Sequence, residues 1–506
     1  MESKNIKLYL LCILVGVGTG IVTVPYRYLL EKASSLREIL YSHGEPWWFH
    51  LLIILTMWAA GIGIYFLVKN FKIISGSGIP QVEGAIFGRF HFNHPFKELV
   101  SKFIGGVTGI GMGFSLGREG PSVQMGAFVA RLIGKWSRAS ISEQRYLYTG
   151  GASAGLSAAF IAPLASSIFV VEEMEKFDSI KIIITSLLAS IISGTMAQWA
   201  FPGNIYAPID AAYPSELSLP ALILSFIAFS VVLTIVGKGF NFFLLYFQKK
   251  YQEITIPVYL KILSVIIMTY ILGYFFIDLI AGGEQFLIHQ AGTTVYTGIL
   301  FLCGIIAIKL LFTTICYATG FPGGIFLPLL VIGGLTGKMF SLILVDMGWM
   351  SPEHFGFFMA IGMAAAFAAV VRSPITGIIL LLEMTHKFEL LVPMTIVVGL
   401  TYFISDIAGV KAIYDQLYQK LLPKDLSRSK ARLTIPFEIN TDSYMEGKRI
   451  TEIIFPEGCH IEKIIRNQKS ISTNDTILKP GDQINISLYS RDLEKLFRSF
   501  RSMANE

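Results

Sequence analysis

The feature that most constrains this chain is a series of apolar segments, each close to the length that crosses a lipid bilayer. Clear examples are Leu8–Val24, His50–Val68, Leu219–Val236 and Ile262–Ile277. A helix of about 20 apolar residues spans the hydrocarbon core. Only 15% of the residues are charged and 53% are hydrophobic, so we expect an all-α polytopic membrane protein. The first segment has no small-residue cleavage site, and we interpret it as a retained helix.

One apolar stretch, Gly105–Gly126, combines glycine with charge. It reads GGVTGIGMGFSLGREGPSVQMG and holds eight glycines, with Arg118 and Glu119 side by side before Pro121. Ionisable groups at membrane depth are costly and by default mark an ion or proton path. The run suits a break between helices, followed by a new helix whose N-terminus attracts anions. An ionised Glu119 would occupy the anion's place and leave it when protonated. The alternative is a packing seam whose charged pair only holds helices together.

The two hydrophobic halves of the chain are weak copies of each other. The matching stretches are GGASAGLSAAFIAPLASSIFVVEEM (150–174) with IGMAAAFAAVVRSPITGIILLLEMT (361–385), and GREGP (117–121) with GIFLP (324–328). The aligned pairs are Pro163 with Pro374, Glu172 with Glu383, Gly151 with Gly362, and Gly126 with Gly333. Repeats with broken helices in corresponding places indicate a transporter-type duplication with a binding site between the copies, usually inverted in the membrane.

We expect four parts in the chain. They are a first membrane repeat over 1–205, a second over 206–422, a basic linker over 423–432 and a small α+β domain over 433–506. The first two join within the proline-rich stretch Phe201–Pro220. The linker's basic residues place it on the cytoplasmic side: Lys420, Lys424, Arg428, Lys430 and Arg432. The net charge of +6 lies in such loops and in the tail, and does not indicate nucleic-acid binding.

Three further motifs offer groups that can bind an anion without adding charge. SGSGIPQVEG (75–84) places Ser77 among glycines before a proline, and GFPGGIFLP (320–328) leaves the amides of Ile325 and Phe326 at another helix start. Tyr414 follows the last apolar segment and supplies a phenol donor. None of these signals is specific alone. The histidines and cysteines form no metal-ligand cluster.

Together and in this order, GSGIP, GREGP and GIFLP resemble the signature motifs of the CLC chloride channel and transporter family, over about residues 5–420. The resemblance implies two inverted repeats of short tilted helices, one anion pathway in each subunit, and a homodimer. It implies chloride binding by Ser77, Tyr414 and the amides of Ile325 and Phe326, and it makes Glu119 the external gating glutamate. Structural roles beside the pore fall on Arg118 and Glu83, as an ion pair, and on Gly117 and Gly324.

The VVEEM stretch bears on proton coupling. The family's exchangers deliver protons through a second glutamate on the cytoplasmic side, and the match falls on Glu173, whose repeat counterpart is Met384. Glu175 departs from the exchanger pattern, where we expect a basic residue, and three carboxylates this close repel one another. The alternative is an acidic helix end that faces water.

We therefore predict a chloride/proton antiporter of a bacterial plasma membrane, with a passive chloride channel as the alternative. Fluoride exporters of the family carry other residues at the position of Ser77, so the resemblance implies chloride as the anion. A fluoride/proton exporter is the second alternative. A sensor with a membrane anchor is disfavoured by the intact anion motifs. We find no hydrolase or transferase constellation, so we do not expect an enzyme, a metal or a cofactor.

The tail resembles the TrkA-C or RCK-C domain of potassium transport systems, chiefly in LKPGDQINI (478–486). We expect strands in LTIPFEI and DQINISLY, a turn at KPGD, and helices in ITEIIF and RDLEKLFRSF. The resemblance implies a cytoplasmic dimer that binds a small regulatory ligand, such as cyclic di-AMP. The alternative is a dimerisation module without a ligand.

Overall fold

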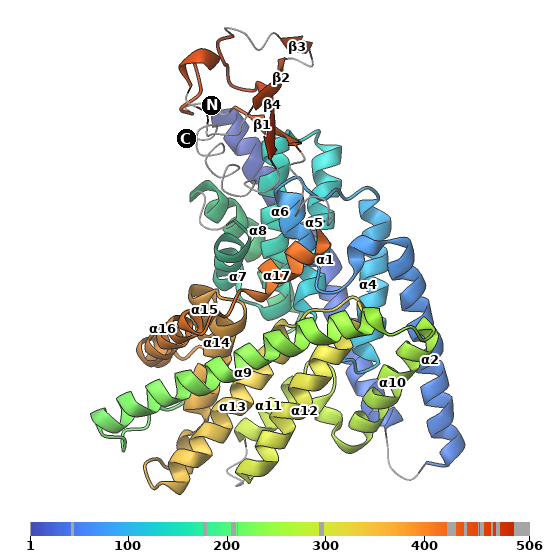
Figure 1. Cartoon of the computed structure of the whole chain (residues 1–506), viewed down its shortest axis with the longest axis vertical. Coiled ribbons are helices and arrows are strands. Elements are labelled where there is room, and N and C mark those ends of the chain that lie inside the picture. Colours follow the sequence, from blue (N-terminus) through green and yellow to red (C-terminus); the bar gives the residue numbers. More distant parts are fainter. Residues whose placement is uncertain are drawn as a thin grey trace.

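The computed structural model describes residues 2–41, 45–175, 180–203, 209, 211–292, 298–422, 432–439, 443–453, 455, 460–466, 469–471 and 476–489. This part of the chain is mostly helical, with a small sheet near the C-terminus (Figure 1). Nine of the described helices are long and apolar enough to cross a membrane. The predicted class, an all-α polytopic membrane protein with a small α+β domain, is confirmed.

The described residues of the first repeat form eight α-helices. They are α1 (Glu2–Leu40), α2 (Trp47–Asn70), α3 (Ile79–Ile86), α4 (Pro95–Gly111), α5 (Glu119–Trp136), α6 (Ile141–Phe160), α7 (Pro163–Phe169) and α8 (Ile180–Ala200). A π-helical segment, η2 (Val170–Glu175), directly follows α7. The apolar segments Leu8–Val24 and His50–Val68 lie inside α1 and α2, as predicted.

The second repeat has the same order of helices. They are α9 (Leu219–Glu253), α10 (Val258–Phe275), α11 (Glu284–Gly292), α12 (Ile299–Ala318), α13 (Phe326–Asp346), α14 (Phe355–Val370), α15 (Pro374–Thr385) and α16 (Leu391–Ile407), followed by α17 (Ile413–Leu421). The predicted segment Ile262–Ile277 ends sooner than expected. At Phe276 the backbone leaves the helical region (φ −141°, ψ 68°), and a 3₁₀ turn, Ile277–Leu279, follows.

The two repeats run in opposite directions. We call the side of the molecule that carries the sheet the tail side. From the centre, α5 runs towards the tail side, whereas its counterpart α13 runs away from it (Figure 1). The aligned prolines Pro163 and Pro374 each occupy the first position of a short helix, α7 and α15, where a missing N–H costs nothing. The inverted arrangement that we inferred from the repeats is present.

Two helix crossings repeat with glycine at each contact. In the first repeat α5 crosses α6 at Gly126 and Gly151, and in the second α13 crosses α14 at Gly333 and Gly362. At each of the four positions a Cβ atom would overlap the carbonyl oxygen of the glycine opposite. The helices therefore meet backbone to backbone, which small residues permit. The predicted alignment of these glycines matches the structure.

A buried lysine holds the same loop in each repeat. Each ammonium donates to two carbonyl oxygens just before a short helix: Lys102 to Ile74 (2.9 Å) and Gly76 (2.7 Å), and Lys309 to Leu279 (2.7 Å) and Ala281 (2.8 Å). Both lysine side chains are fully buried. A buried amino group needs such hydrogen-bond partners, so these lysines fix the loops that precede α3 and α11.

The described part of the tail is an antiparallel sheet in the order β1-β4-β2-β3. Its strands are β1 (Arg432–Glu438), β2 (His460–Arg466), β3 (Lys469–Ile471) and β4 (Gln483–Tyr489). The strands expected in LTIPFEI and DQINISLY are confirmed. ITEIIF forms only a 3₁₀ turn, Ile450–Glu452, so the expected helix is wrong there. Phe87, which follows α3, packs against the core of the sheet.

Several predictions fall outside the described residues. They concern the boundary between the repeats at 205–206, the basic linker except for Arg432, the helix expected in RDLEKLFRSF, and Cys459.

Candidate functional site

The motifs GREGP and GIFLP meet at the centre of the molecule. Gly117 and Gly324 exchange two backbone hydrogen bonds of 2.7 Å each, in an isolated antiparallel bridge. Directly after this bridge α5 begins at Glu119 and α13 begins at Phe326. The first amides of a helix lack intrahelical acceptors and carry partial positive charge. The two N-termini therefore bring polarised amides together, and the predicted helix break at GREGP is confirmed.

Ser77 reaches this place from a third helix N-terminus. Gly78 adopts a left-handed conformation (φ 95°), and α3 begins at the next residue. A Cβ on Gly120, in the first turn of α5, would lie 2.5 Å from Ser77 Oγ. The serine side chain therefore packs against the start of α5, and only glycine at Gly120 leaves room for it.

Tyr414 completes this group from a separate short helix, α17, which packs against α3. The side chain is fully buried and lies near Ser77 and Glu119. Ser77 Oγ and Tyr414 Oη are buried, and neither has a hydrogen-bond partner among the described residues. A buried polar atom without a partner costs about 1–3 kcal/mol. Two neighbouring hydroxyl groups without partners suit an anion.

The Glu119 carboxylate lies in the same place. Its side chain is fully buried, and within the described chain neither carboxylate oxygen has a hydrogen-bond partner. A Cβ on Gly117 would overlap Glu119 Oε2 and lie 3.2 Å from the amide nitrogen of Leu327. The carboxylate therefore sits beside the first amides of α13, where a free anion would also be stabilised.

The three carboxylates of the 172–175 stretch point to different partners. Glu173 accepts a hydrogen bond of 2.7 Å from Ser373 Oγ, and Glu175 is paired with Arg145. Thr149 Oγ1 also donates to Glu175 (2.9 Å). All three carboxylates lie in the π-helical segment η2, and residues two apart in a helix do not face each other. The mutual repulsion that we expected is therefore offset, because each carboxylate has its own donors.

Glu172 and its repeat counterpart Glu383 each cap the N-terminus of a helix in the opposite repeat. Glu172 accepts from the amides of Ile375 (3.2 Å) and Thr376 (2.8 Å) at the start of α15. Glu383 accepts from the amides of Leu164 (3.0 Å) and Ala165 (2.7 Å) at the start of α7. A carboxylate at a helix N-terminus satisfies orphan amides and favours the helix dipole. This reciprocal pair joins α7 to α15 across the repeats.

Two residues of the site were not predicted from the sequence. Ser373, the donor to Glu173, directly precedes Pro374 of the aligned repeat. Its position next to this proline was the one hint in the sequence. Tyr317 lies beside Gly76 and Tyr414, and a Cβ on Gly76 would be 3.2 Å from the Tyr317 hydroxyl oxygen. Only its position just before GFPGG hinted at this contact.

Arg118 and Glu83 are both buried side chains on helices that start at the site. Arg118 precedes Glu119 and lines two cavities, one near the ends of α6 and α8 and one beside α1 and α11. Glu83 lies on α3, which begins directly after Ser77 and Gly78. Each of the two has interactions within the described chain, and their ion pair stays a prediction.

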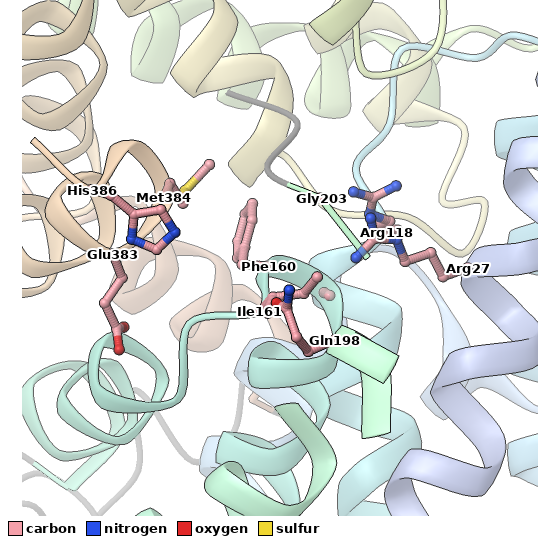
Figure 2. A pocket seen from close by; sticks show the side chains of 10 residues that line it. Arg27, Arg118, Phe160, Ile161, Gln198, Gly203, Glu383, Met384 and His386 are labelled. Carbon is pink, nitrogen blue, oxygen red and sulfur yellow. The ribbon is translucent and has the colours of Figure 1, made fainter. Parts of the chain in front are cut away.

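A cavity of about 200 Å³ opens beside Arg118, and we call it the Phe160 cavity. Arg27 and Arg118 lie on one wall, Glu383 and His386 on the opposite wall, and Phe160 between them (Figure 2). The Phe160 ring packs against the Phe326 ring, with their centroids 5.1 Å apart. Phe160 therefore lies between the cavity and the start of α13. It lies away from the tail side, because α6 begins near the tail and ends at Phe160 (Figure 1).

Comparison with known proteins yields relatives along most of the chain. Residues 60–406 match the family described as "Voltage gated chloride channel", and residues 436–501 match the TrkA-C domain. The H(+)/Cl(−) exchange transporter ClcA of Klebsiella pneumoniae is 32% identical over 441 residues, which is 85% of this chain and 92% of that protein. The predicted TrkA-C resemblance of the tail is thus confirmed.

Solved structures share the fold. The crystal structure of a slow cyanobacterial Cl⁻/H⁺ antiporter matches with a TM-score of 0.74 and 27% identity, over 82% of this chain and 98% of that chain. A CLC-type fluoride/proton antiporter matches with a TM-score of 0.68 over the same shares, and its 22% identity supports the fold alone.

Proposed function

Because the chain belongs to the voltage-gated chloride channel family, we propose that it exchanges chloride for protons across a membrane. The observation that carries this function is the shared place of Glu119 and an anion. The buried carboxylate and two unpartnered hydroxyl groups, on Ser77 and Tyr414, meet at helix N-termini. Chloride and the ionised carboxylate compete for the same donors, so movement of one depends on the other.

In the proposed mechanism chloride accepts hydrogen bonds from Ser77, Tyr414 and the amides of Ile325 and Phe326. Chloride displaces the Glu119 carboxylate, which leaves these donors most readily when a proton neutralises it. Glu119 then releases its proton and returns to the anion site as a carboxylate. One chloride cycle and one protonation of Glu119 are thereby linked.

Glu173 is the proposed inner proton group. Its side chain is 3% exposed and lies near Tyr414, held by the hydroxyl of Ser373. A buried carboxylate at membrane depth suits proton transfer. We place the tail in the cytoplasm of a bacterial cell, so Glu173 serves the cytoplasmic side and the Phe160 cavity faces outward. The counterpart Met384 in the other repeat cannot carry a proton.

Proton uptake into liposomes, driven only by a chloride gradient, tests this function. The wild-type protein should move protons uphill, in proportion to chloride and blocked by an uncoupler. Glu119→Gln should keep chloride movement and lose proton movement, because the amide cannot be protonated. Chloride flux without proton movement in the wild type would instead establish a passive channel. Persistent proton pumping by Glu119→Gln would refute the competition mechanism.

The assembly and the tail ligand are proposals that rest on the resemblance. We propose a homodimer in which each subunit has its own pathway, testable by light scattering of the detergent-solubilised protein. We also propose that the TrkA-C domain binds a small ligand such as cyclic di-AMP. Calorimetric titration of the full-length protein with cyclic di-AMP tests this, and no heat of binding at micromolar protein would contradict it.

A further inference from the structure

A second cavity lies on the other side of Arg118, with a different chemistry from the Phe160 cavity. We call it the Glu284 cavity, and its volume is about 320 Å³. Arg118 and Leu327 line its inner end, and its wall carries four carboxylates: Glu31, Glu38, Asp278 and Glu284. Among the described residues that line the Phe160 cavity, the one carboxylate is Glu383, which is engaged by the amides of α7. Arg118 thus lines both cavities, one with basic and aromatic groups and one with several acidic groups.

The repeat explains where Glu284 stands. The loops held by Lys102 and Lys309 share their backbone conformation, since Gly76 and Ala281 are both left-handed (φ 65° and 52°), as are Gly78 and Gly283 (φ 95° and 87°). In the first repeat Ser77 lies between the two left-handed residues of its loop, and in the second repeat Gly282 does. Gly282 is therefore the structural counterpart of Ser77.

Glu284 fills the space that the Ser77 side chain fills in the other repeat. A Cβ on Gly282 would overlap Glu284 Oε2 and lie 2.5 Å from Leu327 Cδ2. The matching contact in the first repeat is that of Ser77 Oγ with Gly120. A carboxylate thus takes the outer position that corresponds to the inner serine hydroxyl.

Leu327 links this carboxylate to Glu119. The Leu327 amide lies beside Glu119 Oε2, and its side chain lies against Gly282 and hence beside Glu284. Glu284 is close enough to interact electrostatically with Glu119. The ionisable groups around Glu284 on the surrounding elements are Glu31, Arg37 and Glu38 on α1, Asp278 before α11, Arg118 and Glu119 at α5, and Lys309 on α12.

We propose that Glu284 passes protons between the outer solution and Glu119 through the Glu284 cavity, while anions enter through the Phe160 cavity. The inference rests on the proposed chloride/proton exchange. In each step protonated Glu284 gives its proton, through water in the cavity, to the Glu119 carboxylate. The Glu284 carboxylate then takes a proton from the outer solution. Both groups exchange only a proton, so charge and atoms balance at every step.

The test compares Glu284→Gln with Glu38→Gln, which removes an exposed carboxylate from the rim of the same cavity. Exchange is measured in liposomes as a function of external pH at constant internal pH. We expect Glu284→Gln to slow coupled exchange about 100-fold at alkaline external pH, which is the lower end of the effect of a lost proton-transfer group. Acidic external pH should restore the rate, Glu284→Asp should retain most of it, and Glu38→Gln should show no such pH dependence.

Two outcomes would overturn the relay alone. One is an unchanged rate of Glu284→Gln at every external pH. The other is a loss of chloride flux in the double variant Glu119→Gln/Glu284→Gln, relative to Glu119→Gln, as large as the loss that Glu284→Gln causes in the wild type. No proton step remains in the Glu119→Gln background, so the effect would then be on the anion. A wild-type protein that moves chloride without protons would overturn the exchange itself and the relay with it, and is recognised before any variant is compared.

Discussion

Replacing Gly126 by alanine tests whether the close crossing of α5 and α6 positions the site. A Cβ at Gly126 would overlap the carbonyl oxygen of Gly151 and lie 2.7 Å from its carbonyl carbon. Because nonbonded carbon atoms need about 3.5–4.0 Å, the two backbones must separate by about 1 Å. The contact is backbone to backbone, so no flexible side chain can absorb this shift.

The expected cost follows from two opposing terms. Overpacking of a close contact destabilises by about 1–3 kcal/mol, and alanine regains about 1 kcal/mol over glycine inside a helix. Gly63 on α2 is the matched control, because a Cβ there meets nothing within 4 Å and Gly63→Ala reports the propensity gain alone. We expect Gly126→Ala to unfold several degrees below Gly63→Ala in the same detergent, since 1 kcal/mol shifts the midpoint of a 150–250-residue domain by about 2–4 °C.

The same displacement should slow transport. Glu119 begins α5, so a shift of this helix moves the carboxylate and the first amides relative to Ser77. A misplacement of about 1 Å can lower a rate by about 100-fold, and chloride flux per reconstituted protein should fall in Gly126→Ala but not in Gly63→Ala. Equal midpoints and equal fluxes of the two variants would refute the claim that this crossing positions the site.

Two further predictions concern helix caps and the tail. Glu172→Ala or Glu383→Ala should each destabilise the protein by about 1–3 kcal/mol, because charge-assisted hydrogen bonds to helix amides are lost; unfolding midpoints equal to that of the exposed control Glu389→Ala would contradict this. In the tail, Arg466 donates two hydrogen bonds of 2.6 Å to the buried carboxylate of Asp482. Asp482→Asn should therefore speed amide hydrogen exchange in β4 of the full-length protein without changing α5, and unchanged protection of β4 would speak against it.

The breaks in the helices could be predicted because glycine and proline act locally. GREGP and GIFLP each turn the chain and start a helix, and both do so in the structure. The glycine crossings were predictable for a related reason: a pair such as Gly126 and Gly151 recurs in the second repeat, and repeated small residues indicate close helix packing. Local chemistry and the repeat together therefore account for the scaffold around the site.

The partners of the charged groups could not be predicted in the same way. Glu173 is bound by Ser373 and Glu175 by Arg145, and no pattern in VVEEM indicates either partner. Glu284 could not be predicted either, because it lies outside the aligned stretches of the repeats, and only the structure pairs Ser77 with Gly282. Such assignments depend on contacts between segments far apart in the chain.

The symmetry of the backbone and the asymmetry of the side chains have separate consequences. Two inverted repeats bring two helix N-termini to one place, and this alone provides amides for an anion. Phe326 is the repeat counterpart of Glu119. A chain with phenylalanine at both positions would bind an anion without any group to exchange for it. Glu119 breaks the symmetry at the anion site, and Glu173, whose repeat counterpart is Met384, breaks it on the inner side. Under the proposed exchange, proton coupling therefore depends on the few positions where the copies differ, while anion binding depends on what they share.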